Sequence, residues 1–434
     1  MAAVAAFLVL ARIALLARDI VLAAKFGTGS TVDAFNVAFA VINWPTQILV
    51  SLMTIALVPA LVELGMADSR QDQAKLLGEM NAMALTGAIL TAVTLWLLAS
   101  PLTGLFAGDL SQRTTQSALE FTRGFAPVAG FLVLAGYLGV RLQALRDNSF
   151  TLFEGLPALG IIVLVVLGSH GLAQTESRFV LGLLVGAIAQ CAALLMLLRR
   201  RHEPFGGILP SITAPQWRSI GTAMGAMAIG QVLMSLTIPV DQYFVARLGD
   251  GELARFGYAS RIVSLVNTLG SVVIGRVLLA SFTEKAVGGV HAESLKAAVG
   301  WAAAFLAGGL AIALLGQGGL DPVISLIFQR GAFGSDEVGK VADMAAILVF
   351  QIPLFLAGMV LVQWYASRRD YTMLLRAAIC GLVLKGATIA AGAVLYNANW
   401  VLWSTVTLYI GTFGYMAAGL VKRAHSRKQA GAAR

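Results

Sequence analysis

Twelve apolar segments, each long enough to cross a lipid bilayer as a helix, follow one another along this sequence. A helix needs about 20 mainly apolar residues to span the hydrocarbon. The chain is 58% hydrophobic and 12% charged, whereas soluble domains are about 45–50% apolar and about 25% charged. We therefore expect an all-α polytopic membrane protein. The segments cover residues 2–24, 33–62, 80–100, 124–143, 150–168, 178–198, 219–246, 254–281, 297–315, 343–366, 373–394 and 401–421.

The loops between these segments carry an uneven number of basic residues. Cytoplasmic loops of membrane proteins are enriched in Lys and Arg. One side of the predicted topology holds 18 basic residues and the other holds 8, so we expect both termini in the cytoplasm. We expect the N-terminus to be the first membrane helix and not a removed signal peptide. The net charge of +9 then reflects topology and contact with anionic lipid, and not a nucleic-acid partner.

The two halves of the sequence are related. Asp19 opens a pattern that recurs at Asp241: four residues, Ala, a base, an apolar residue, Gly, any residue, Gly. Arg146-Asp147 likewise recurs 223 residues later as Arg369-Asp370. Six helices separate the copies, which predicts parallel repeats, two six-helix lobes and a central cavity between the lobes. The predicted domains are an N-lobe (1–200), a cytoplasmic linker (201–218), a C-lobe (219–421) and a basic cytoplasmic tail (422–434).

Five basic residues fall inside the predicted spans. An arginine at the bilayer centre costs about 2.5–3.5 kcal/mol on insertion scales, so these side chains must face protein, water or an anionic ligand. Guanidinium groups match phosphate oxygens, which makes all five candidates for binding an anionic substrate. They are Arg12, Arg18, Arg261, Arg276 and Lys385.

Several partners remain open for these cations. Arg18 either enters a central cavity or pairs with Asp19 and extends to the interface, and Arg12 has Asp33 or Asp241 as possible partners. Lys385 is either a cavity cation or the partner of Asp241. The acids Asp19, Asp33 and Asp241 are candidates for salt bridges with these bases or for binding a coupling proton or cation.

No enzyme signature and no cofactor site stands out in the sequence. His170, His202, His291 and His425 lie in predicted loops or the tail without metal-ligand spacing, and there is no phosphate-binding loop. Cys191 and Cys380 sit in separate apolar runs, where we expect small buried side chains. We therefore predict a protein that is not an enzyme and that binds no metal.

Four stretches of the sequence form a recognisable set: Arg18-Asp19 through Phe26-Gly27 to Asp33-Ala34-Phe35, Tyr258–Arg261, Leu326–Phe333 and Tyr365–Asp370. Together they resemble the MviN/MurJ lipid II flippases of the multidrug/oligosaccharidyl-lipid/polysaccharide exporter superfamily. The resemblance implies a bacterial inner-membrane flippase that moves an undecaprenyl-pyrophosphate-linked saccharide outward by alternating access, in peptidoglycan biosynthesis. It also implies that Arg18 and Arg261 hold the pyrophosphate and that Asp19 and Asp33 are important acids.

The sequence departs from this family in three places. Residues 43–51 lack the arginine and the acid that the family has in its second helix, Lys385 stands in the helix that supplies sodium-binding acids in some members, and no thirteenth or fourteenth helix follows. The resemblance is therefore to a short, divergent member. The alternatives are an exopolysaccharide or O-antigen repeat-unit flippase, or a non-transporting membrane partner of a polysaccharide-assembly complex. Expected partners are the lipid-linked substrate, membrane lipids and other cell-wall or polysaccharide-synthesis proteins.

Overall fold

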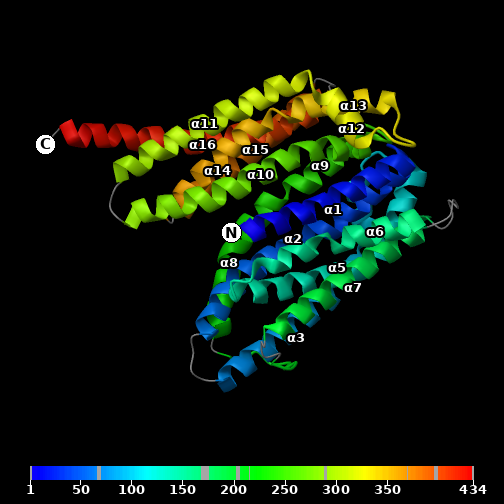
Figure 1. Ribbon diagram of the computed structural model, residues 1–434, viewed down its shortest axis with the longest axis horizontal. Helices are drawn as coiled ribbons and strands as arrows, with labels where there is room; N and C mark the ends of the chain where they lie inside the picture. Colours follow the sequence, from blue (N-terminus) through cyan, green and yellow to red (C-terminus); the bar gives the residue numbers. More distant parts are fainter. Residues whose placement is uncertain are drawn as a thin grey trace. The chain divides into compact units, whose positions relative to one another are not determined.

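The computed structural model of the chain consists of long α-helices packed side by side (Figure 1). It describes residues 2–65, 70–167, 175–201, 206–214, 216–287, 291–368, 370–394 and 399–432, and no strand occurs in these ranges. Contacts divide the chain into two compact units, unit 1 (Met1–Ala254) and unit 2 (Arg255–Arg434). An all-α architecture is confirmed.

Unit 1 is built around α5, which packs against three long neighbours, α2, α3 and α7 (Figure 1). Phe35 of α2, Phe121 and Phe125 of α5 and Phe179 of α7 form a buried aromatic cluster with ring centroids 5.3–5.8 Å apart. The helices of unit 1 are α1 (Ala2–Phe26), α2 (Ser30–Gly65), α3 (Arg70–Leu97), α4 (Ala99–Ala107), α5 (Gln112–Ala144), the 3-10 helix η1 (Asn148–Gly155), α6 (Leu156–Leu167), α7 (Thr175–Arg200), α8 (Gln216–Ser235) and α9 (Thr237–Ala246).

In unit 2, α14 packs against α11 and α16, and α15 lies along α16. The fully buried Tyr365 of α14 donates to the carbonyl oxygen of Met416 in α16 at 2.9 Å. The helices of unit 2 are α11 (His291–Gln317), α12 (Leu320–Phe328), α13 (Ser335–Leu348), α14 (Gln351–Ala366), α15 (Tyr371–Val394) and α16 (Asn399–Ala432). One more helix, α10 (Glu252–Val287), starts three residues before the boundary and lies mostly in unit 2.

Glycines allow α6 and α7 to approach until their backbones touch. A Cβ at Gly160 would lie 2.1 Å from the carbonyl oxygen of Gly182, and one at Gly186 would lie 2.4 Å from that of Leu156. Gly182 and Gly186 form a small-xxx-small pair, a pattern that lets membrane helices pack closely. Any larger side chain at these positions would push the two helices apart.

Nine of the twelve predicted spans appear, within the described residues, as helices long and apolar enough to cross a membrane. The other three predicted spans fall on α1, on α8 with α9, and on α10, which are helices too. Proline has no N–H and is favoured in the first turn of a helix, which accounts for some of the helix starts, although Pro45, Pro59 and Pro127 lie inside α2 and α5. Pro101, Pro239 and Pro353 each occupy the third position of a helix, in α4, α9 and α14 respectively.

The packing boundary differs from the boundaries drawn from the repeat. Helices α8 and α9 belong by sequence to the second half, yet they pack against α2, and α9 also packs against α4 in unit 1. The packing boundary at residue 254 therefore describes contacts, whereas the predicted domains describe the internal repeat and stay a prediction. The predicted tail does not start at a helix end, because α16 continues to Ala432.

The predicted linker is anchored to unit 1 by one buried carboxylate, Glu79 of α3. Glu79 is fully buried and accepts hydrogen bonds from the backbone N–H groups of Thr213 and Ala214, both at 3.1 Å. The side chains of Ser211, Thr213 and Trp217 donate to it as well, at 2.6–2.9 Å. Five donors around one carboxylate hold residues 211–214 and Trp217 against the cytoplasmic end predicted for α3.

The same ion pair occurs once in each unit. Asp147, between α5 and η1, binds Arg201 at 2.7 Å, and Asp370, its mate in the repeat, binds Arg423 in α16. Arg423 follows Arg201 by 222 residues, so both partners keep the offset of the repeat. Burial raises the pKa of Asp147, but hydrogen bonds from Ser149 and Arg201 outweigh it and hold this pKa below its ordinary value.

We expect Glu79→Gln to destabilise unit 1, because an amide has one acceptor atom and brings two N–H donors into a ring of donors. Leaving buried donors unsatisfied costs about 1–3 kcal/mol each, so the loss should reach at least 2 kcal/mol. Thermal unfolding in detergent, followed by tryptophan fluorescence, measures it. Glu63→Gln at the exposed end of α2 is the matched control and should change little. Equal melting temperatures for the two variants would contradict the anchoring role.

The Asp147–Arg201 pair should make stability depend on acidic pH. Because the folded-state pKa of Asp147 lies below its ordinary value near 3.8, its contribution is fully present above pH 5 and is lost as the pH falls through the folded-state pKa. We expect Asp147→Asn to melt lower than the unmodified chain at pH 5–8 and the two melting curves to converge below about pH 4. A difference in melting temperature that stays constant down to pH 3 would refute this role.

Candidate functional site

Two ionised residues lie buried side by side in α1. The Arg18 Nε and Nη2 atoms donate to Asp19 Oδ1 at 3.0 and 2.7 Å, and the two residues are 2% and 6% exposed. Of the two alternatives for Arg18, the structure thus has the pairing with Asp19. The pair lies about two turns before Gly27, whose φ of +58° ends α1 in the left-handed conformation that favours glycine.

The rest of the Arg18 guanidinium is held by aromatic rings of α2. Its Cζ atom lies 5.5 Å from the centroid of Phe35 and 5.1 Å from that of Phe39, within the range of cation–π attraction. Its Nη1 atom is buried and has no hydrogen-bond partner among the described residues. One edge of the guanidinium is therefore neutralised by Asp19, and the Nη1 donors are available to a further acceptor.

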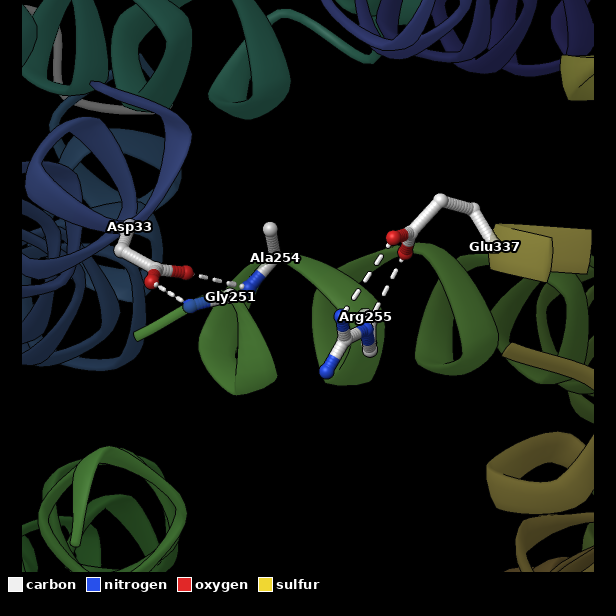
Figure 2. Close-up of polar contacts among 5 residues, drawn as sticks. All are labelled: Asp33, Gly251, Ala254, Arg255 and Glu337. Atoms are coloured by element: carbon white, nitrogen blue, oxygen red, sulfur yellow. Dashed lines mark hydrogen bonds and ion pairs between the residues drawn. The ribbon is translucent and has the colours of Figure 1, made fainter. Parts of the chain in front are cut away.

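Asp33 joins the starts of two helices (Figure 2). It lies in the first turn of α2, and its fully buried carboxylate accepts from the backbone N–H groups of Gly251 and Ala254, the latter at 2.7 Å. Both of these residues belong to unit 1, at the start of α10. A negative charge at a helix N-terminus is favourable, and here one charge serves two N-termini.

The next residue along α10 makes an ion pair within unit 2 (Figure 2). Arg255 donates through Nε and Nη2 to the two carboxylate oxygens of Glu337, at 3.1 and 3.4 Å, near the start of α13. Both side chains are largely buried, at 14% and 21% exposure. Arg255 follows Asp33 by 222 residues, the offset of the repeat. Equivalent positions of the two halves thus carry opposite charges, each used to hold a helix start.

Lys385 is a buried cation in the core of unit 2. It is 2% exposed, and its Nζ atom lies 3.4 Å from Ser404 Oγ and 3.3 Å from Thr405 Oγ1 of α16. Thr388 and Thr407 bond to each other across the same two helices at 2.9 Å. The sequence left Lys385 as a cavity cation or a partner of Asp241, and the structure gives it hydroxyl groups between α15 and α16.

The structure shows fewer contacts for the remaining predicted site residues. Arg12 is exposed on α1 and interacts electrostatically with Glu154 of η1, a partner that the sequence did not suggest. Arg261 is half-buried in α10 and belongs to unit 2, and Asp241 is half-buried in α9 of unit 1. Arg276 lies within α10, but its side chain is outside the described residues. The expected convergence of Arg18 and Arg261 stays a prediction.

Sequence reasoning missed the polar cluster at the predicted cytoplasmic end of α3. Besides Glu79, it contains Asn81 of α3, whose Oδ1 accepts from Tyr137 at 2.7 Å and from Arg141 at 3.4 Å. The signal was present, since Glu79 and Asn81 flank Met80 at the start of an apolar segment. Starting that segment at residue 80 had placed Glu79 in a loop. Within the described part of the chain, no group of three or more His, Cys, Asp or Glu could hold a metal ion.

The long apolar helices and the buried ionised side chains define a multi-pass membrane protein of a transporter fold. Two solved structures share this fold. A lipid II flippase MurJ in an inward closed conformation matches with a TM-score of 0.79 at 17% identity, over 97% of this chain and 87% of that one. An inward-facing multidrug resistance transporter of the MATE family, in the MOP superfamily, matches with a TM-score of 0.76 at 15% identity, over 96% of each chain.

The sequence identifies the family within that fold. The family model described as lipid II flippase MurJ matches residues 22–433, and the chain belongs to this family. A relative from Bdellovibrio bacteriovorus, named "Probable lipid II flippase MurJ", is 25% identical over 381 residues, which cover 83% of this chain and 69% of the relative. The expected family is thus confirmed. The matched range starts at residue 22, after Arg18 and Asp19.

We expect Asp33→Asn to destabilise unit 1, because the neutral amide presents only one oxygen to two backbone donors and removes the charge from two helix N-termini. Losing a cap of this kind costs about 0.5–2 kcal/mol. Thermal unfolding in detergent measures the loss. Asp109→Asn is the matched control, since Asp109 pairs with Arg247 but is 63% exposed, and exposed pairs contribute at most about 1 kcal/mol. A larger loss for Asp109→Asn would contradict the role given to Asp33.

Proposed function

We propose that this protein is a flippase that moves an undecaprenyl-pyrophosphate-linked saccharide, lipid II or a related lipid-linked glycan, from the cytoplasmic to the outer leaflet of the bacterial inner membrane by alternating access. Family membership over residues 22–433 supports the class of substrate. The basic-residue count supports cytoplasmic termini. Other cell-wall or polysaccharide-synthesis membrane proteins are the protein partners that such a role would require.

One observation carries the proposed mechanism: the state of Arg18. Its guanidinium is almost fully buried, is fixed by Asp19 and two phenylalanine rings, and keeps Nη1 without a partner among the described residues. A buried N–H donor without an acceptor is unfavourable, so a bound anion would gain a charge-assisted hydrogen bond that needs little reorganisation. A diphosphate offers such an oxygen, and Asp19 limits the net charge that must be desolvated.

Asp19 also gives a reason for release. A guanidinium facing a diphosphate alone would bind strongly in a low-dielectric site, where charges interact far more strongly than in water. Transport requires that the substrate leaves on the other side of the membrane, so the site must bind the diphosphate weakly enough for it to dissociate. A carboxylate already bonded to the same guanidinium lowers the attraction for the diphosphate. We infer that Arg261, the other predicted cavity arginine, contributes a second phosphate contact.

Transport by the purified chain in proteoliposomes tests this function, with fluorescent lipid II and a membrane-impermeant quencher added outside. Because a hydrogen bond to a charged group contributes about 1.5–3 kcal/mol, we expect Arg18→Ala and Arg261→Ala each to slow flipping by about ten- to hundredfold. Arg18→Lys keeps the charge but loses the planar fork, so an intermediate rate is expected.

Arg330→Ala, at an exposed arginine after α12, is the matched control and should flip at the unmodified rate. Unmodified flipping by both Arg18→Ala and Arg261→Ala would eliminate the diphosphate contacts. Absence of any flipping by the unmodified chain, with either lipid II or another undecaprenyl-diphosphate glycan, would eliminate the transport function itself.

A further inference from the structure

A basic cavity lies in unit 2 beside the Asp370–Arg423 ion pair. It has a volume of about 740 Å³, in the size range of ligand pockets. Among the described residues, four basic side chains and no carboxylate line it: Arg368 after α14, Arg376 of α15, and Lys422 and Arg423 of α16. Trp364 and Tyr415 add aromatic surface. The excess of positive charge makes an anion the fitting ligand.

Two of the four cations are held in place by the protein. The Arg368 Cζ atom stacks 4.3 Å from the centroid of Trp364, and its Nη2 atom lies 3.3 Å from Ser294 Oγ. Trp364 itself donates to the same Ser294 oxygen at 3.1 Å. Arg423 is bound to Asp370 and lies 5.3 Å from the ring of Tyr365. Such fixed guanidiniums lose little entropy when an anion binds.

The other two cations, Arg376 and Lys422, are exposed, and Arg423 is 45% exposed as well. Asp370 pairs with Arg423 from outside the residues that line the cavity. The first half lacks two of these four basic residues. With the offset of 223 that relates Asp147 to Asp370, the equivalents of Arg368 and Arg376 in the first half are Leu145 and Phe153, whereas Lys422 and Arg423 correspond at an offset of 222 to the basic Arg200 and Arg201. Arg368 and Arg376 are therefore basic in the second half alone.

The position of the cavity, near the ends of the membrane spans, fits a lipid headgroup. Three of the membrane spans of unit 2 that border it carry its basic residues, at or next to their ends: Ser335–Ala366, Tyr371–Gly392 and Asn399–Arg423. Arg368 follows the first of these by two residues, Arg376 lies in the first turns of the second, and Lys422 and Arg423 end the third. The basic-residue count predicts this side to be cytoplasmic, where anionic lipids attract basic clusters. Met373 and Ala418 give the cavity an apolar wall that acyl chains could follow.

We propose that this cavity binds the phosphate-bearing headgroup of a lipid in the cytoplasmic leaflet, at a site separate from Arg18 and independent of transport. The fixed pair Arg368 and Arg423 contacts the phosphate, and the exposed Arg376 and Lys422 add further contacts to it. The ligand is held by charge and hydrogen bonds, so a zwitterionic headgroup without net charge binds more weakly. Occupancy by such a lipid joins α14, α15 and α16 at their predicted cytoplasmic ends.

Lipid titration of the purified full chain in detergent, read by native mass spectrometry, tests the proposal with dioleoylphosphatidylglycerol and dioleoylphosphatidylcholine as probes. A basic residue near an anionic membrane surface contributes about 1 kcal/mol, so the double variant R376Q/K422Q should bind phosphatidylglycerol about thirtyfold more weakly. R376K/K422R keeps both charges and should bind nearly as the unmodified chain does. R199Q/R200Q removes two exposed bases from the same predicted side of unit 1 and is the matched control.

The outcomes separate the possible sources of the phosphate. A loss of phosphatidylglycerol binding in R376Q/K422Q alone, with phosphatidylcholine bound weakly throughout, supports a resident phospholipid. A loss confined to undecaprenyl diphosphate, titrated in the same way, supports the site and assigns it to the carrier lipid. Displacement of phosphatidylglycerol by equimolar inorganic phosphate would overturn the assignment to a lipid. Equal binding by R376Q/K422Q and R199Q/R200Q would overturn the site.

Discussion

The absence of water in the bilayer core governs the polar part of this structure. A charged or hydrogen-bonding group placed there must find its partner within the protein or in a ligand, because no solvent can replace it. The described buried charges follow this rule in three ways. Arg18 uses a neighbouring acid, Asp33 uses two backbone N–H groups at the start of α10, and Lys385 uses the hydroxyl groups of a packed helix. Only the first of these leaves a buried donor atom without a partner in the described chain.

That difference separates structural charges from a candidate binding charge. The carboxylate of Asp33 accepts from two backbone N–H groups at the start of α10, and we expect its removal to affect the fold. The guanidinium of Arg18 has more donors than Asp19 can accept, and its planar shape is fixed by Phe35 and Phe39. Membrane depth alone does not separate a structural charge from a binding charge. The number of hydrogen-bond donors left after local pairing separates them, and Arg18 is the residue of this group with such a donor.

The fold followed from the sequence because hydropathy and length are local properties. Each apolar segment can be recognised as a membrane helix from its own residues, and the helix-breaking effect of a residue such as Pro239 is local as well. Partners of buried charges depend instead on which helices touch. Arg12 was expected beside Asp33 or Asp241, and Glu154 approaches it because α1 packs on η1. Glu79 was overlooked because its five partners come from a segment more than 130 residues away.

The internal repeat explains why the two units share one ion pair between equivalent helices but differ in their other charged residues. The ion pairs Asp147–Arg201 and Asp370–Arg423 join equivalent helices in the two units. Other equivalent positions of the two halves differ. Asp33 and Arg255 have opposite charges, and the apolar Leu145 and Phe153 are the first-half equivalents of Arg368 and Arg376. The basic residues Arg368 and Arg376 are therefore particular to the second half. They lie beside Arg423, which is positioned by an ion pair that both halves share.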